Sequence, residues 1–141
     1  MTRIGLILFI PLLLIFSMSC STSSDSQDDD WQYLTSDYKN ISPNEVIGNG
    51  ETILIDFYSE TCHTCKTTQP KIHRIKEKYQ NKITFYTVNL SNTLSKSWGS
   101  MFQPRATPTI ILIDPYGDIK YRGNGTLNEN KLTEAIETII N

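Results

Sequence analysis

Apolar and polar residues alternate with two different periods along this chain of 141 residues, and the changes of period divide it into strands and helices. Short β-branched and aromatic runs predict strands, whereas apolar residues spaced three and four apart predict helices. The pattern predicts, in chain order, a short helix after residue 42, a strand over 52–58, a helix over 62–79, a strand over 82–90, a helical crossover over 91–101, a strand over 109–113, a returning strand over 118–122 and a C-terminal helix after residue 126. Such alternation is typical of an α/β domain.

Individual residues in three of these elements carry more detailed expectations. In the crossover helix we expect Leu94, Trp98 and Met101 to be the buried members. Segments 42–45 (Ser-Pro-Asn-Glu) and 126–129 (Thr-Leu-Asn-Glu) each have the spacing of a capping box and predict the helix starts. Residues 31–38 are rich in aromatic side chains and supply either an edge strand or simple packing against the core.

The first thirty residues differ in composition from the rest. Residues 1–19 combine one early positive charge with an apolar run and a small-residue end, which predicts a signal peptide. Residues 21–30 contain no apolar side chain and predict a flexible acidic linker. A cysteine directly after such a run, here Cys20, resembles a bacterial lipoprotein signal. That resemblance implies a lipid on Cys20 and a membrane-tethered domain outside the cytoplasm; an ordinary cleaved signal and an uncleaved anchor are the alternatives.

Chain length and net charge limit the possible domain organisation and the possible binding partners. About 110 residues follow the linker, which is enough for one domain with a single core, so we expect residues 31–141 to form one monomeric domain. The formal net charge of -2 gives no indication of nucleic-acid binding.

Two cysteines follow the strand over 52–58 directly and open the next helix, in the segment Cys62-His63-Thr64-Cys65. Backbone N–H groups at a helix start stabilise a thiolate, so this placement indicates redox chemistry. A structural disulfide or half of a zinc site is the alternative, but zinc would need two further ligands and few soft donors remain. We therefore expect no bound metal.

The segment from the strand through these cysteines resembles the active-site region of thioredoxins, and Thr107-Pro108 provides a second match. The resemblance covers residues 31–141. It implies a thioredoxin fold, with a central mixed sheet flanked by helices on both faces, and no cofactor beyond the redox-active disulfide of Cys62 and Cys65.

The resemblance assigns roles to three residues. Cys62 is expected to attack a substrate disulfide, and Cys65 to resolve the mixed disulfide. Asp56 interrupts an apolar strand, and a buried carboxylate there would have a raised pKa suited to taking the proton of Cys65 through a water; the alternative is a surface aspartate on an edge strand. Thioredoxins often place a lysine against this carboxylate, where Thr87 stands here.

Around the cysteines, the resemblance implies a substrate-binding rim. The Thr107–Pro108 bond is expected to be cis and to present the backbone of Thr107 to substrate, although an ordinary trans proline at a strand start is the alternative. Tyr58 and Thr61 stand where thioredoxins carry tryptophans. Gly125 matches a rim glycine, or is simply a cap before the last helix.

His63 and Thr64 are expected to tune the redox potential. A histidine beside the thiolate, without a proline before Cys65, predicts a potential less reducing than the roughly -270 mV of thioredoxin.

These features predict a thiol–disulfide oxidoreductase that reduces or isomerises disulfides in exported proteins. Electrons would come from a membrane reductase, because the chain has no nucleotide-binding signature. A thiol oxidase of the same fold is one alternative. A Cu(I)-binding metallochaperone without turnover is another.

Overall fold

The computed structural model describes residues 41–141, so the signal peptide, Cys20, the linker and the segment 31–38 lie outside the described residues. The elements in chain order are α1 (Pro43–Val46), β1 (Ile53–Tyr58), α2 (His63–Tyr79), β2 (Thr84–Asn89), the 3₁₀ turn η3 (Thr93–Ser95), α3 (Lys96–Phe102), β3 (Thr109–Ile113), β4 (Ile119–Asn124) and α4 (Glu129–Ile140). Every strand and helix expected in this part of the chain is present.

The four strands form one mixed sheet in the order β2-β1-β3-β4. β1 pairs parallel with β2 and antiparallel with β3, and β3 pairs antiparallel with β4 through a tight hairpin. Every residue of β3, and all of β1 except its last residue, is buried, because both strands lie inside the sheet with helices on either face.

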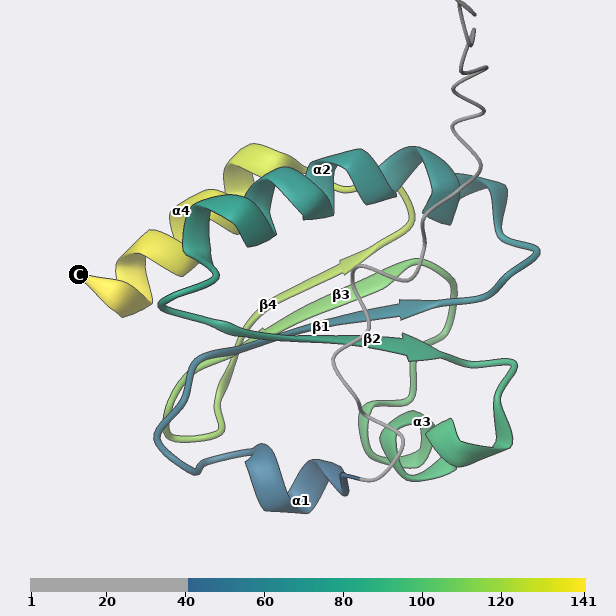
Figure 1. Ribbon diagram of the computed structural model, residues 1–141, viewed down its shortest axis with the longest axis horizontal. Coiled ribbons are helices and arrows are strands. Elements are labelled where there is room, and N and C mark those ends of the chain that lie inside the picture. Colours follow the sequence, from purple (N-terminus) through teal and green to yellow (C-terminus); the bar gives the residue numbers. More distant parts are fainter. Residues whose placement is uncertain (1–40) are drawn as a thin grey trace, which may run out of the picture.

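Helices cover both faces of the sheet, as expected. Figure 1 shows α2 and α4 over one face and α1 and α3 over the other. Successive β1 side chains point to opposite faces, so Leu54 packs in the cluster under α2 and α4, whereas Ile53, Ile55 and Phe57 pack in the other. Asp56 follows Leu54 by two residues, so its side chain lies on the same face of the sheet and points toward α2.

The buried side of the crossover helix differs from the expectation. Trp98 is fully buried, but Leu94 and Met101 are 55% and 42% exposed, so both predictions were wrong. Ser95 and Phe102 are buried instead. For Leu94 the reason is the 3₁₀ turn that opens the crossover, because three residues per turn bring Ser95 rather than Leu94 in line with Trp98. Met101 lies after that turn, within α3, where Phe102, four residues after Trp98, takes the buried side of the helix.

Both predicted capping boxes also need correction. Ser42 is the N-cap of α1, but its side chain makes no capping hydrogen bond. α4 begins two residues later than expected, with Asn128 as its N-cap: the Asn128 side chain accepts from the backbone N–H of Lys131. Asn and Asp are at least as good as Thr at this position, so Asn128 replaces Thr126 as the cap.

Candidate redox site

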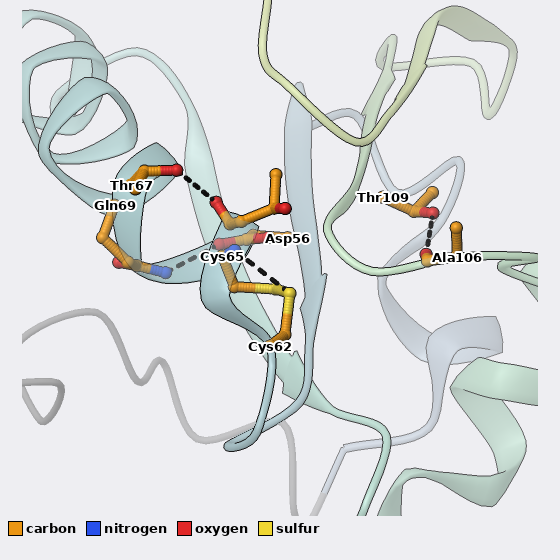
Figure 2. The surroundings of a disulfide bond; sticks show 8 residues. Asp56, Cys62, Cys65, Thr67, Gln69, Ala106 and Thr109 are labelled. Atoms are coloured by element: carbon orange, nitrogen blue, oxygen red, sulfur yellow. Dashed lines mark hydrogen bonds between the residues drawn. A yellow bond between two sulfur atoms is a disulfide. The ribbon is translucent and has the colours of Figure 1, made fainter.

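The two cysteines lie at the N-terminus of α2 and form a disulfide. Cys62 is the N-cap, and its sulfur accepts a hydrogen bond of 3.0 Å from the backbone N–H of Cys65 (Figure 2). Cys62 is half-buried, whereas Cys65 is only 1% exposed. An incoming thiolate or disulfide therefore reaches Cys62 first, and the same N–H can stabilise a thiolate on that sulfur.

The neighbouring residues of this turn are more open. His63 and Thr61 are exposed, while Thr64 is half-buried and its carbonyl accepts the hydroxyl of Thr67 at 3.0 Å. Glu60, just before the turn, accepts a hydrogen bond of 2.8 Å from the buried Asn89 at the end of β2. The loop that carries Cys62 is thereby fixed to the sheet.

Asp56 is buried in the middle of β1, with 2% of its surface exposed. β1 is a central strand, so the alternative of an edge aspartate does not apply. Burial raises the pKa of the Asp56 carboxyl to about 7, although a hydrogen bond from Gln69 acts to lower it. Gln69 Nε2 donates to Asp56 Oδ2 at 3.0 Å (Figure 2). A carboxyl with this pKa exchanges protons readily near neutral pH.

The position of Gln69 relates this carboxyl to the disulfide. Gln69 follows Cys65 by four residues in α2, so the two side chains lie on the same helix face, one turn apart. That face is turned toward Asp56, since Gln69 bonds to it. Sequence reasoning missed Gln69, although the four-residue spacing was a signal that could have revealed it.

The Thr107–Pro108 peptide bond is cis, as expected. Strand register places it at the same end of the sheet as the cysteines: Phe57, near the end of β1, pairs with Thr109 at the start of β3. Tyr58, half-buried, is the last residue of β1 on that edge.

Three hydrogen bonds hold the loop around Pro108. The N–H of Gly125 donates to the carbonyl of Pro108 at 2.8 Å, so Gly125 does lie at the loop, with φ at +71°. The buried Thr109 hydroxyl lies 2.6 Å from the carbonyl oxygen of Ala106 and 2.8 Å from Oδ1 of Asn124 (Figure 2 draws the first). The single hydroxyl proton of Thr109 is thus shared between two acceptors, the Ala106 carbonyl and Oδ1 of Asn124.

The described part of the chain offers no candidate for a metal site or a membrane span. Within residues 41–141, no group of three or more His, Cys, Asp or Glu side chains is placed to hold a metal ion. Across the same residues, no helix has the length and apolarity needed to cross a membrane.

Comparison with known proteins identifies one family. The thioredoxin family profile matches residues 36–138. A thioredoxin of Borreliella burgdorferi is 33% identical over 113 residues, which cover 80% of this chain and 90% of that protein. The chloroplastic thioredoxin-like protein HCF164 of Arabidopsis thaliana is 24% identical over 95 residues, 67% of this chain, but the chain spans only 36% of that protein's length. Among solved structures, the thioredoxin of Fasciola hepatica superposes with a TM-score of 0.55 at 26% identity, covering 68% of this chain and 86% of that one.

Proposed function

The chain belongs to the thioredoxin family, and from that premise we propose that it reduces or isomerises disulfides of exported proteins while tethered to a membrane. It is a thioredoxin-like disulfide oxidoreductase, with Cys62 and Cys65 as its dithiol pair. The observation that carries the proposal is the pairing of a reachable sulfur with a shielded one at a helix start. Thioredoxins need no cofactor beyond such a disulfide.

The reduced site reacts in two displacement steps. The Cys62 thiolate attacks one sulfur of a substrate disulfide, forming a mixed disulfide and releasing the other substrate sulfur as a thiolate. The Cys65 thiolate then attacks Cys62, which restores the Cys62–Cys65 disulfide and releases the second substrate thiolate. Two electrons pass from the dithiol to the substrate.

Asp56 is the proposed base of the second step. A thiol as deeply buried as Cys65 stays protonated unless a neighbouring group accepts its proton. The Asp56 carboxyl, with a pKa near 7, can accept that proton at neutral pH. Substrate is proposed to lie against Thr107 and Pro108, with Tyr58, Thr61 and Gly125 around it. His63 and Thr64 are proposed to tune the potential.

The proposed compartment and electron source rest on the sequence alone. The apolar leader, the cysteine at position 20 and the acidic linker favour a lipid-anchored protein on the outer side of a bacterial membrane. A reductase in that membrane would then return electrons to the Cys62–Cys65 disulfide.

Insulin reduction with dithiothreitol as electron source tests the activity. We expect Cys62→Ser to abolish it and Cys65→Ala to accumulate mixed disulfides with substrate, while Cys20→Ala retains full activity. Unchanged activity in Cys62→Ser would exclude the proposed chemistry.

Fatty-acid labelling in a bacterial host tests the tether. The wild-type chain should take up label and fractionate with membranes, and Cys20→Ala should do neither. An unlabelled soluble product would indicate an ordinary cleaved signal, and an unlabelled membrane protein an uncleaved anchor. The redox state of Cys62 and Cys65 in those cells distinguishes a reductase, held mostly as dithiol, from an oxidase, held mostly as disulfide.

A further inference from the structure

Within residues 41–141, one hydrogen-bond donor, the Gln69 amide, serves the two oxygens of the Asp56 carboxyl. Gln69 donates to Oδ2, whereas Oδ1 is buried and has no partner among the described residues. An ionised carboxylate offers about four acceptor positions, so this site satisfies the anion poorly. One neutral donor is therefore the main local support that the anion receives.

The described side chains around Asp56 supply no charge to its carboxyl. Its partners in the sheet are Thr87 on β2 and Ile110 on β3, neither of which is ionisable in the ordinary range. On the helices over this face, Lys71 donates to a backbone carbonyl, and Arg74 and Lys78 pair with α4 carboxylates. Among residues 41–141, no charged side chain from α2, α4 or either strand contributes to the pKa shift of Asp56.

We propose that Gln69 is a positioning residue for the redox reaction: its amide holds Oδ2 of Asp56, leaves Oδ1 to receive the Cys65 proton, and sets the pH at which that transfer occurs. This inference rests on the proposed role of Asp56 as the base. Gln69 thus holds the Asp56 carboxyl from α2, whereas a charged partner would hold it from β2.

The transfer balances within the site. The proton leaves Cys65 Sγ and reaches Oδ1 of Asp56 through a water, and the electron pair left on sulfur forms the bond to Cys62 Sγ. The bond between Cys62 and the substrate sulfur breaks, and the substrate leaves as a thiolate. The Gln69 amide neither gains nor loses a proton, so its support of Asp56 does not change with pH.

Carbon-13 NMR titration of the Asp56 carboxyl in the oxidised protein tests the inference, because cysteines in a disulfide do not titrate. Gln69→Met preserves the length of the side chain and removes the donor. Losing one hydrogen bond to an anion should raise the Asp56 midpoint, which lies near 7 in the wild type, by about one pH unit. Gln69→Glu replaces the donor with a second carboxyl and should raise the upper midpoint of the pair further.

Gln80→Met provides the matched control. Gln80 is the exposed C-cap of the same helix, and eleven residues of helix place it about 16 Å from Gln69 along the axis. Its replacement should leave the Asp56 midpoint unchanged. Equal midpoints in wild type, Gln69→Met and Gln69→Glu would overturn the inference, as would a shift of the same size in Gln80→Met.

Kinetics then distinguish failure of this inference from failure of the proposed base. In Gln69→Met, the pH midpoint of Cys65 attack on the mixed disulfide should rise with the Asp56 midpoint. In an Asp56→Asn background, Gln69→Met should not change the pH dependence of Cys65 attack on the mixed disulfide. A purely structural effect of Gln69→Met would instead add to the effect of Asp56→Asn. An NMR shift with normal kinetics in Asp56→Asn would support Gln69 as the group holding Asp56 and refute Asp56 as the base.

Discussion

The burial of Asp56 makes a quantitative prediction for the stability of the oxidised protein. The native carboxyl has a pKa of about 7 against an ordinary value of 3.8, a difference of about three pH units. Each unit corresponds to about 1.4 kcal/mol, so the buried anion lowers the free energy of unfolding by about 4 kcal/mol when fully charged. Asp56→Asn keeps the shape of the side chain and removes the charge.

The sign follows from which state binds the proton. Below about pH 4 both folded and unfolded chains hold it, so the wild type and Asp56→Asn should differ little. Between about pH 4 and 7 only the folded state holds it, and the stability contributed by the neutral carboxyl is lost as the pH rises. Above pH 7 the folded wild type carries the charge, and the advantage of Asp56→Asn should level off near 4 kcal/mol.

Urea unfolding of the oxidised proteins at several pH values between 4.5 and 8.5 measures this difference. Asp118→Asn is the control, because the Asp118 side chain is 72% exposed, and we expect it to stay within about 0.5 kcal/mol of wild type throughout. A difference between wild type and Asp56→Asn that stays flat across this range would refute the reasoning. So would an Asp56→Asn protein that is less stable than wild type at pH 8.5.

Three further predictions concern the rest of the fold and the redox potential. Trp98→Ala should lower the free energy of unfolding in urea by about 3–5 kcal/mol, because the ring is fully buried between Tyr86 and Phe102. Leu94→Ala, at an exposed position, should lower it by less than about 0.5 kcal/mol, and similar losses in the two variants would contradict this packing. Asn128→Ala should lower the free energy of unfolding by about 1 kcal/mol because the N-cap of α4 is lost, and Thr126→Ala should lower it by less. The reverse order would identify Thr126 as the N-cap. Glutathione titration should give a potential less reducing than about -270 mV, and His63→Ala should make it more reducing; a wild-type value at or below -270 mV would refute this expectation.

The sequence was most informative where local pattern and chemistry coincide. A β-branched run followed by two cysteines at a helix start predicted β1, α2 and the disulfide together, because each of these depends on neighbouring residues. The sequence also predicted that Thr87 stands where thioredoxins often carry a lysine, and parallel pairing does place Thr87 opposite Asp56. These features rest on strand order and register, which the hydrophobic pattern largely determines.

The sequence was less informative where geometry departs from regular periods or where contacts are long-range. The exposure of Leu94 depends on a 3₁₀ turn that no residue in the segment clearly predicts, and in α3 the period allowed either Met101 or Phe102 to be the buried residue after Trp98. The hydrogen bond from Gln69 to Asp56 joins residues 13 positions apart on two elements. Its donor is an ordinary polar residue in a helix, and only the packing of α2 on the sheet brings it to the carboxyl.

The difference in burial between the two sulfurs connects the two halves of a catalytic cycle. When an external thiolate reduces the disulfide, it must attack the half-buried Cys62, so the departing thiolate is that of Cys65, which is 1% exposed. A charge at that depth is costly unless a proton reaches it. Asp56, with a pKa near 7, is about half protonated at neutral pH and can supply that proton. The carboxyl that we propose as the base in substrate reduction would therefore act as the acid when the site is reduced again, and a pKa near the working pH suits both steps.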